Sequence, residues 1–219
     1  MNALAQLPRL LRKSAAYPLA EQLRAHVDGE VLFDSFSRGR YATDASIYQL
    51  EPVGIVVPKN EDAARAAIQI AAEQGVPVLP RGAGTSQCGQ TVGVALVIDC
   101  SKYLNNVIEV DIPVETVTVQ PGVVLDHLNA LLRPHGWWFP VDVSTSAQAT
   151  IGGMAGNNSC GARSIRYGNM VHNVAAIDAF LADGSRLKLG QVGGTDQGPA
   201  SRNLVNRDEA SDKREADDN

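Results

Sequence analysis

Residues 80–86 read Pro80-Arg81-Gly82-Ala83-Gly84-Thr85-Ser86, a glycine-rich turn that ends one predicted strand and leads toward another. A buried strand is predicted at residues 53–57, a helix at 60–74 and a second strand at 76–79, from their apolar runs and helical periodicity. The turn therefore lies at the carboxyl end of a strand, where open α/β units bind ligands. The next element predicted after it is another strand, at 95–99, and not a helix.

Two well-known phosphate-binding motifs do not fit this turn. A dinucleotide-binding G-x-G-x-x-G motif that starts at Gly82 requires a third glycine where Gln87 stands, and no helix is predicted to follow. From Gly84 the spacing matches a P-loop, but Gln90 replaces the lysine that reaches the outer phosphates. What remains is a run of backbone N–H groups, in which two glycines are able to take positive φ, and such a concavity binds anions without a helix. An ordinary glycine turn stays open as the alternative.

The composition of the chain excludes several classes of protein. With 219 residues and 44% hydrophobic content, the chain is long enough to form a core in one or two domains. The net charge of −5 and the aromatic content of 5% argue against a nucleic-acid partner. No apolar run approaches the roughly 20 residues of a transmembrane helix, and charges interrupt the N-terminal region where a secretory signal would be apolar.

The three cysteines are Cys88, Cys100 and Cys160, and their spacing fits neither a disulfide framework nor a metal site. We therefore expect a protein of a reducing, cytoplasmic setting. No metal ion is expected.

The chain divides into three predicted segments. Residues 1–45 form an N-terminal lead-in that packs on the domain and contains a helix at 19–27. Residues 46–190 form the domain itself. Residues 191–219 are dense in charged side chains without an apolar face, so we expect a disordered tail. Within the domain, further elements are predicted as strands at 106–110 and 116–120, a helix at 123–132, and a hairpin of residues 174–182 and 186–189 joined by Asp183-Gly184.

A second glycine-rich segment, residues 140–168, precedes the hairpin. Its stretch 150–161 carries four glycines together with Asn157 and Asn158, residue types that most readily visit left-handed conformations. Hydroxyl donors lie along the same path, at Ser144, Thr145, Thr150 and Ser159. Structureless loops of this length are uncommon unless they are functional. We therefore expect a backbone wrapped closely around a flat or anionic ligand, with a surface loop as the alternative.

In combination, these segments resemble the FAD-binding domain of the vanillyl-alcohol oxidase / p-cresol methylhydroxylase superfamily. More narrowly, they are similar to the branch that contains D-lactate, glycolate and D-2-hydroxyglutarate dehydrogenases. The resemblance covers residues 45–190 and rests on several motifs in the order of the family. They are Pro80–Ser86, Gln90-Thr91, Val119-Gln120-Pro121-Gly122, Pro140-Val141-Asp142, Thr150-Ile151-Gly152-Gly153, Asn157-Asn158, Tyr167-Gly168 and Leu181-Ala182-Asp183-Gly184.

The resemblance implies an α+β fold, a two-lobed PCMH-type FAD-binding domain with a small βαβ lobe and a larger, mostly antiparallel lobe with helices. In such proteins the first loop wraps the FAD pyrophosphate, and the second runs beside the ribityl chain and the isoalloxazine. Ala83 stands where members often have a third glycine, which requires a negative φ at this residue. The residues that the resemblance assigns to FAD are Pro80, Arg81, Gly82, Ala83, Gly84, Thr85, Ser86, Gln90, Asp142, Ser144, Thr145, Thr150, Gly152, Gly153, Asn157, Asn158, Ser159, Cys160, Tyr167 and Val174. Of these, Tyr167 and Val174, together with Ile165, are expected near the adenine-ribose end or in support of it.

Covalent attachment of the flavin, which occurs in some relatives through histidine or cysteine, is not expected. The first loop contains no histidine, and His172 lies past the second loop. Neither Cys88 nor Cys160 has a flanking base in the sequence. We therefore expect noncovalent FAD. No catalytic base is named, because His127 and His135 lie on or just after a predicted helix, where surface or capping roles are more common.

For activity, the resemblance implies oxidation of a D-2-hydroxy acid by hydride transfer to FAD, followed by electron transfer to a quinone, a cytochrome or an iron–sulfur protein. We expect the catalytic base and any metal ligands beyond residue 219, although Arg163 and Arg166 are candidates for holding the substrate carboxylate. A truncated, catalytically silent FAD-binding module stays open as a second hypothesis. A third is another branch, such as an alditol oxidase or a cell-wall precursor reductase. Peripheral association of the full enzyme with a membrane is left open.

Overall fold

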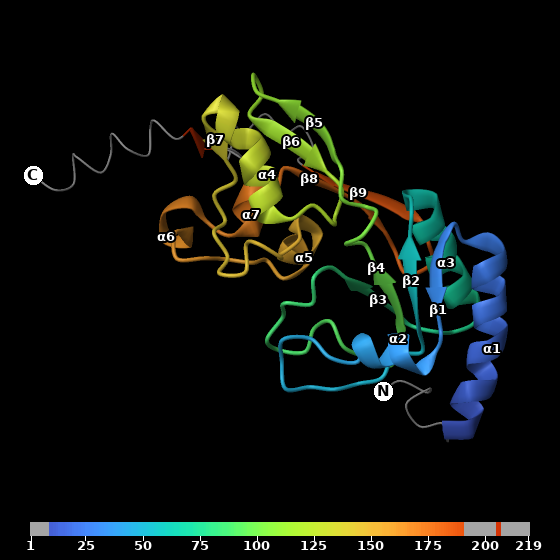
Figure 1. Cartoon of the computed structure of the whole chain (residues 1–219). Coiled ribbons are helices and arrows are strands. Elements are labelled where there is room, and N and C mark those ends of the chain that lie inside the picture. The colour runs from blue at the N-terminus through green and yellow to red at the C-terminus, as the bar shows by residue number, and fades with distance from the viewer. Residues whose placement is uncertain (1–8, 191–204, 207–219) are drawn as a thin grey trace, which may run out of the picture. The chain divides into compact units, whose positions relative to one another are not determined.

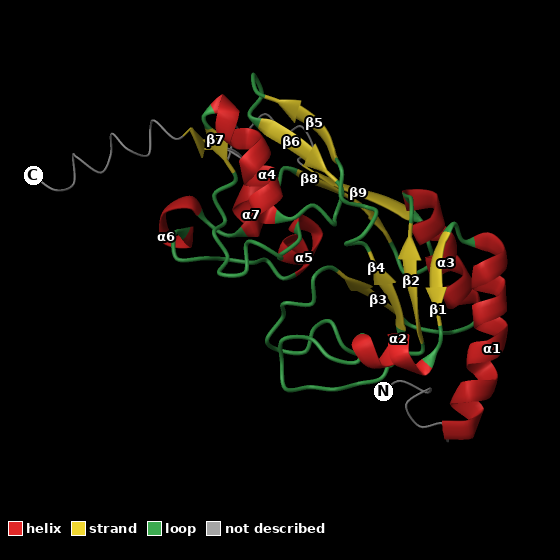
Figure 2. Ribbon diagram, viewed as in Figure 1, coloured by secondary structure: helices red, strands yellow, loops and turns green. Residues whose placement is uncertain are grey.

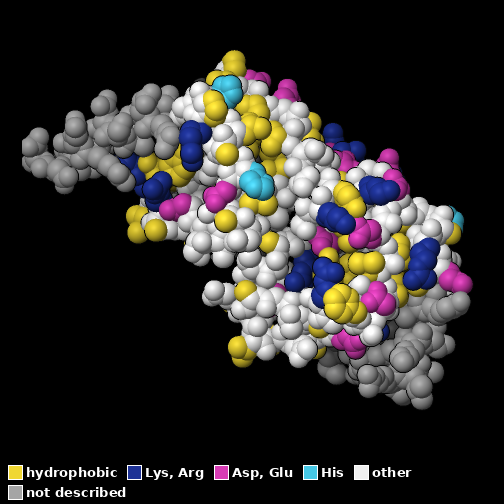
Figure 3. Space-filling model, in the orientation of Figure 1, with side chains coloured by type: hydrophobic (Ala, Val, Ile, Leu, Met, Phe, Trp, Pro, Cys, Tyr) yellow, Lys and Arg dark blue, Asp and Glu magenta, His cyan; other side chains and the backbone are white. Residues whose placement is uncertain are grey.

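The computed structural model describes residues 9–190 and 205–206, and these fall into two compact units. Among the described residues, the first unit takes the chain up to Leu104 together with Ala179–Leu187, and the second takes Asn105–Asp178 and the residues from Lys188 on. Each unit has its own hydrophobic core and is described by itself (Figure 1). On the face drawn in Figure 3, basic and acidic side chains are interspersed, and no extended basic surface is seen there.

The first unit is built on a four-stranded sheet with the strand order β1-β2-β4-β3 (Figure 2). The central strands run parallel, as a βαβ unit requires, and every residue of β2 and β4 is buried. The βαβ lobe predicted from the sequence is therefore confirmed, and the turn after β3 leads into β4 without a helix. The strands are β1 (Gly29–Leu32), β2 (Gly54–Pro58), β3 (Val78–Arg81) and β4 (Leu96–Asp99).

Two helices, α1 (Arg9–His26) and α3 (Glu61–Glu73), cover one face of this sheet. The side chain of Asn60 caps α3 by accepting a hydrogen bond from the N–H of Ala63 at 2.8 Å. The buried face of α3 consists of small side chains, including Ala63, Ala67 and Ala71, which let the helix lie close to the strands. The buried residues of this core are Leu19, Leu23, Val27, Val56, Ala63, Ala67, Ala71, Val76, Leu96 and Ile98.

The N-terminal lead-in contains two elements that the sequence did not predict. β1 pairs antiparallel with β2, from Gly29 opposite Pro58 to Leu32 opposite Ile55, and so forms one edge of the sheet. α2 (Ser35–Arg40) follows it, and the side chain of Asp34 caps α2 by accepting a hydrogen bond from the N–H of Ser37. Both elements are short, and β1 is only half-buried, so neither gave a clear period in the sequence.

The second unit holds short antiparallel strand pairs and helices around a separate core. Leu125, Leu128 and Leu132 are buried at helical spacing along α4, as predicted. β5 pairs with β6, and β7 pairs with β10, in both cases antiparallel. These elements are β5 (Val107–Asp111), β6 (Thr116–Val119), α4 (Leu125–Leu132), a 3-10 turn (Arg133–His135), β7 (Trp137–Trp138), α5 (Ile151–Gly156), α6 (Ser164–Tyr167), α7 (Met170–Asn173) and β10 (Val205–Asn206).

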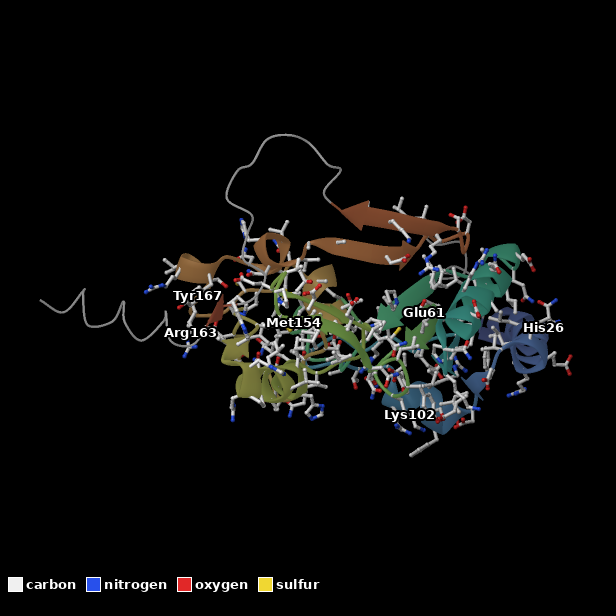
Figure 4. The ribbon with its side chains drawn as sticks, turned by 90° about the horizontal axis from the view of Figure 1, so that it is seen from above. His26, Glu61, Lys102, Met154, Arg163 and Tyr167 are labelled. Atoms are coloured by element: carbon white, nitrogen blue, oxygen red, sulfur yellow. The ribbon has the colours of Figure 1, made fainter. Side chains whose placement is uncertain are left out.

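The predicted hairpin is present as β8 (Ala176–Phe180) and β9 (Arg186–Gly190), and its turn contains Gly184 with a φ of +79°. In the first unit, the tip of this hairpin contacts α3. The Nε of Arg65 donates a hydrogen bond to the carbonyl of Gly184 at 3.1 Å, and Arg186 lies 3.9 Å from Glu61, which is labelled in Figure 4. The tail predicted at 191–219 lies outside the described residues, apart from the two residues of β10.

The position of Cys100 at the end of β4 generates a prediction about thiol reactivity. Burial, together with the neighbouring Asp99 carboxylate, raises the pKa of the Cys100 thiol to about 11. Because the thiolate is the reactive form, Cys100 should resist alkylation at about pH 8, whereas the exposed Cys88 and Cys160 should react. Mass spectrometry of alkylated peptides, with and without denaturant, measures this difference. Rapid labelling of Cys100 in the native protein would contradict its placement.

Candidate cofactor site

The turn after β3 presents consecutive backbone donors. Among the described residues, the N–H groups from Gly82 through Gln87 donate to no protein acceptor. Gly84 takes a φ of +70°, whereas Gly82 does not take a positive φ, so the expectation that both glycines would do so is wrong for Gly82. The φ of Ala83 is not positive, as the alanine requires. Successive unpaired N–H groups around a left-handed residue form an anion-binding concavity.

The side chain of Arg81, which was expected to contact the cofactor, is held by protein carbonyls. Its Nη1 donates to the carbonyl oxygens of Tyr41 at 3.3 Å and Thr91 at 3.2 Å, and its Nη2 donates to that of Thr43 at 2.8 Å. The guanidinium also lies 5.2 Å from the centroid of the Tyr41 ring. A Cβ at Gly84 would come within 2.5 Å of Nη2, so a side chain at this position would require the Arg81 guanidinium to shift from its three carbonyl acceptors.

Hydroxyl groups of the first loop have different surroundings. The Ser86 hydroxyl hydrogen-bonds the Gln90 side chain and accepts from the N–H of Cys88 at 3.3 Å. Ser86 and Gln90 therefore stabilise the loop itself. The Thr85 hydroxyl has no protein partner among the described residues, and Thr85 is half-buried. Thr85 is accordingly the hydroxyl of this loop that remains able to bind a ligand.

A neighbouring segment, Tyr41–Ser46, contacts the turn and was not assigned a role from the sequence. The N–H of Ala45 donates to the carbonyl of Gly84 at 3.1 Å, and the Thr91 hydroxyl donates to the Asp44 carboxylate at 3.0 Å. Burial raises the pKa of Asp44, but hydrogen bonds from Ser46 and Thr91 more than offset it, so the pKa lies below its ordinary value. No local sequence signal marks this segment, because its role depends on contacts with residues about 40 positions away.

In the second unit, the glycine-rich segment contains short helices where an irregular loop was expected. α5 begins after Thr150, which is buried and caps the helix by accepting from the N–H of Gly153 at 3.3 Å. Gly168 and Asn158 take positive φ, at 79° and 47°, but the four glycines between 150 and 162 do not. The expectation that those glycines serve left-handed conformations is therefore wrong.

Two of these glycines instead allow close contacts between segments. A Cβ at Gly152 would lie 2.5 Å from the Cβ of Pro121. A Cβ at Gly161 would lie 2.2 Å from both the backbone carbonyl and the carboxylate of Asp142. Distances below 3 Å leave no room for a side chain, so these residues are glycines for steric reasons.

The predicted contacts Asp142 and Tyr167 interact with protein groups in the second unit. The Asp142 carboxylate accepts from the N–H of Arg163 at 3.1 Å and lies 3.6 Å from its Nε. Arg163 also lies 5.1 Å from the Trp138 ring, which packs edge-to-face against Tyr167. Arg163 and Tyr167 are labelled in Figure 4. Arg166 lies over Tyr167 at 5.6 Å. Both candidate carboxylate-binding arginines thus stack on aromatic rings, and Arg163 is in addition ion-paired.

The other predicted contacts of this segment divide into three groups. Asn158 accepts from the N–H of Val171 at 2.9 Å, and Val174 packs on the core of the second unit, so these side chains support the backbone. Cys160 and Ile165 are exposed. The side chains that have no protein partner within the described ranges are Ser144, Thr145, Asn157 and Ser159. Those same ranges contain no group of three or more His, Cys, Asp or Glu side chains placed to hold a metal ion.

Comparison with known proteins establishes the family. A family model described as an FAD binding domain matches residues 52–190. The chain belongs to this family. The match confirms the resemblance drawn from the two loops, and with it the mixed fold of helices and sheets. The unpaired N–H groups of the turn have the donor chemistry that binds a pyrophosphate, a group that FAD carries.

Relatives and one solved structure extend the comparison. The chain is 39% identical over 179 residues to a D-2-hydroxyglutarate dehydrogenase of Pseudomonas putida, and the aligned stretch covers 80% of the chain and 18% of the relative. It is 35% identical to the glycolate oxidase subunit GlcD of Bacillus subtilis, over 78% of the chain and 37% of that protein. A structure of alkyldihydroxyacetonephosphate synthase superposes with a TM-score of 0.70 at 20% identity, over 79% of the chain and 35% of the synthase, and shows the fold alone. The chain thus spans less than two fifths of each protein.

The steric role of Gly161 generates a prediction about stability. Gly161→Ala should lower the free energy of unfolding by about 1–3 kcal/mol, because its methyl group would overlap the backbone of Asp142. Gly156→Ala is the matched control, since a Cβ there meets nothing within 4 Å and alanine favours the helix. Urea unfolding followed by circular dichroism measures both variants. Equal stability of the two would contradict the contact between Gly161 and Asp142.

Proposed function

We propose that this chain is the FAD-binding portion of a flavin-dependent dehydrogenase or oxidase that acts on a D-2-hydroxy acid of the D-lactate, glycolate or D-2-hydroxyglutarate type. The observation that carries the proposal is the run of N–H groups from Gly82 through Gln87, unpaired within the described part of a chain that belongs to an FAD-binding family. The names of the two relatives supply the substrate class.

In this proposal the FAD pyrophosphate accepts hydrogen bonds from the N–H groups of residues 82–87 and from the Thr85 hydroxyl. The ribityl chain and isoalloxazine are bound by those side chains of the second glycine-rich segment that lack a protein partner in the described ranges. They are Ser144, Thr145, Asn157 and Ser159. Most of the other side chains that the sequence assigned to FAD cap, hydrogen-bond or pack within the two loops, whereas Cys160 and Ile165 are exposed. Specific recognition of FAD thus rests on backbone donors and a few hydroxyl and amide groups.

Bound FAD supplies the acceptor for the hydride that leaves the hydroxy-bearing carbon of the substrate. This chain binds the cofactor noncovalently. His172, the histidine nearest the second loop in sequence, accepts from the N–H of Asn169 in a capping box at the start of α7. No hydrogen bond joins the Cys88 or Cys160 thiol to a base in the described residues. A quinone, a cytochrome or an iron–sulfur protein receives the electrons, in a cytoplasmic setting.

No helix among the described residues is long and apolar enough to cross a membrane. Any association of the full enzyme with a membrane that holds a quinone would then be peripheral in this region. The proposal therefore needs no spanning helix within residues 9–190.

Flavin binding by a variant of the first loop tests the cofactor site. Gly84→Ala should abolish tight FAD binding. An alanine at this position would have to adopt an unfavourable positive φ, and its methyl group would meet the Arg81 guanidinium. Gly75→Ala is the control: Gly75 also takes a positive φ, at 64°, but a Cβ there meets nothing within 4 Å. Flavin absorbance retained after gel filtration measures binding. Tight binding by Gly84→Ala would place the pyrophosphate elsewhere.

A catalytically silent FAD-binding module is the second candidate. A chimera in which this chain replaces the matched segment of the Pseudomonas putida relative separates the two candidates. We expect the chimera to reduce a dye with a D-2-hydroxy acid as the electron donor and not with the L-enantiomer. The unaltered relative is the control. FAD binding without turnover in a folded chimera would favour the silent module.

A further inference from the structure

We propose that Arg81 and the segment Tyr41–Ser46 are positioning groups that hold the glycine turn in the shape required for FAD. Arg81 then stabilises the turn and does not bind the phosphates. The segment lies upstream of residues 52–190, which the family model matches. This inference rests on the proposed FAD function and adds a part of the site that lies outside the residues matched by the family model.

The guanidinium of Arg81 connects two stretches of chain that flank the turn. Two of its acceptors, the carbonyls of Tyr41 and Thr43, belong to the upstream segment, and the third, the carbonyl of Thr91, follows the turn. Three carbonyls around one side chain match the planar, multiple-donor geometry of arginine. A side chain engaged in this way leaves the binding of a phosphate to the backbone.

The upstream segment is itself anchored to the end of the central strand β4. The Tyr41 hydroxyl donates to the Asp99 carboxylate at 2.5 Å, and the other oxygen of Asp99 accepts from the N–H and the hydroxyl of Ser101. Burial, followed by the hydrogen bond to Asp99, raises the pKa of Tyr41, so its hydroxyl remains a proton donor at physiological pH.

The contacts of the turn set the directions of its donors. In a trans peptide the carbonyl and the following N–H point in opposite directions. The Gly84 carbonyl accepts from Ala45, which directs the Thr85 N–H away from the upstream segment. The Arg81 carbonyl accepts from Cys100 at 3.0 Å, which in the same way directs the Gly82 N–H away from β4. Tethers at two points thus orient the run of N–H groups before a ligand binds.

A turn that is already ordered binds its ligand more tightly, because binding no longer carries the entropy cost of ordering the backbone. Removing the Arg81 hydrogen bonds should therefore weaken FAD binding by about tenfold to hundredfold. The same loss of affinity is expected whether or not the replacement is charged, because it results from the missing hydrogen bonds that hold the turn and not from a missing positive charge.

The test compares Arg81→Lys with Arg81→Met in the whole chain, by titration of flavin fluorescence. Both variants should lose affinity to a similar extent. If Arg81 bound the phosphates directly, Arg81→Lys would keep most of the affinity, since lysine is itself a good phosphate ligand, and that result would overturn the proposal. Arg24→Met, on the exposed side of α1, is the control and should bind FAD like the unaltered protein.

Thr91 provides a second, milder test that does not depend on the fold tolerating a change at Arg81. Thr91→Val removes the hydrogen bond to Asp44 and should weaken FAD binding severalfold, with little change in the unfolding midpoint of the apoprotein. Thr91→Ser keeps the hydroxyl and should restore affinity. Unchanged affinity in Thr91→Val, or a loss that Thr91→Ser also shows, would overturn the role of Asp44.

The coupling between the two sites and the binding of the unaltered protein complete the test. Thr91→Val combined with Arg81→Met should cost less than the sum of the single effects, because both changes release the same segment. Fully additive losses would contradict a shared tether. Failure of the unaltered chain to bind FAD would refute the proposed function itself, whereas binding that is insensitive to every variant refutes only the positioning role.

Discussion

The parallel pairing of β3 with β4 is the constraint on which the first unit depends. Its register, from Val78 opposite Leu96 to Arg81 opposite Asp99, brings these two charged residues to the same edge of the sheet. Arg81 then reaches the carbonyls of Tyr41 and Thr43, while Asp99 accepts from the Tyr41 hydroxyl. A slip of β3 by one residue would turn the Arg81 side chain to the opposite face of the sheet and release the segment from it, while Asp99 would stay in place on β4, which also pairs with β2.

The two glycine-rich segments reach order by different physical routes. In the first unit, one long side chain and a few hydrogen bonds hold a turn whose N–H groups stay unpaired in the described structure. In the second unit, Gly152 and Gly161 permit close backbone contacts, and Thr150 caps a short helix. Most donors of that helix are therefore satisfied within the protein, and side-chain groups are left to meet a ligand.

Local signals account for what the sequence predicted well. The buried run of β2, the Asn60 cap of α3 and the Asp183-Gly184 turn each act within a few residues, and each was found where expected. The acceptors of Arg81 lie 40, 10 and 38 positions away, so no local pattern reveals them. The sequence likewise shows where glycines cluster. Whether a given glycine is needed for a positive φ or for close contact with another segment becomes clear only when the neighbouring segment is in place.

The balance of charge around the first turn explains why its geometry matters so much. Asp44, whose pKa is lowered on balance by its hydrogen bonds, is ionised at neutral pH and accepts from the Thr91 hydroxyl, while the Thr91 carbonyl accepts from Arg81. One residue thus connects a positive and a negative side chain, and their fields largely offset at a distance. In the proposed site, attraction for a pyrophosphate comes from the oriented N–H dipoles, which act together only when they converge. An anion site of this kind depends on the contacts that hold its backbone more than on the charge of its sequence.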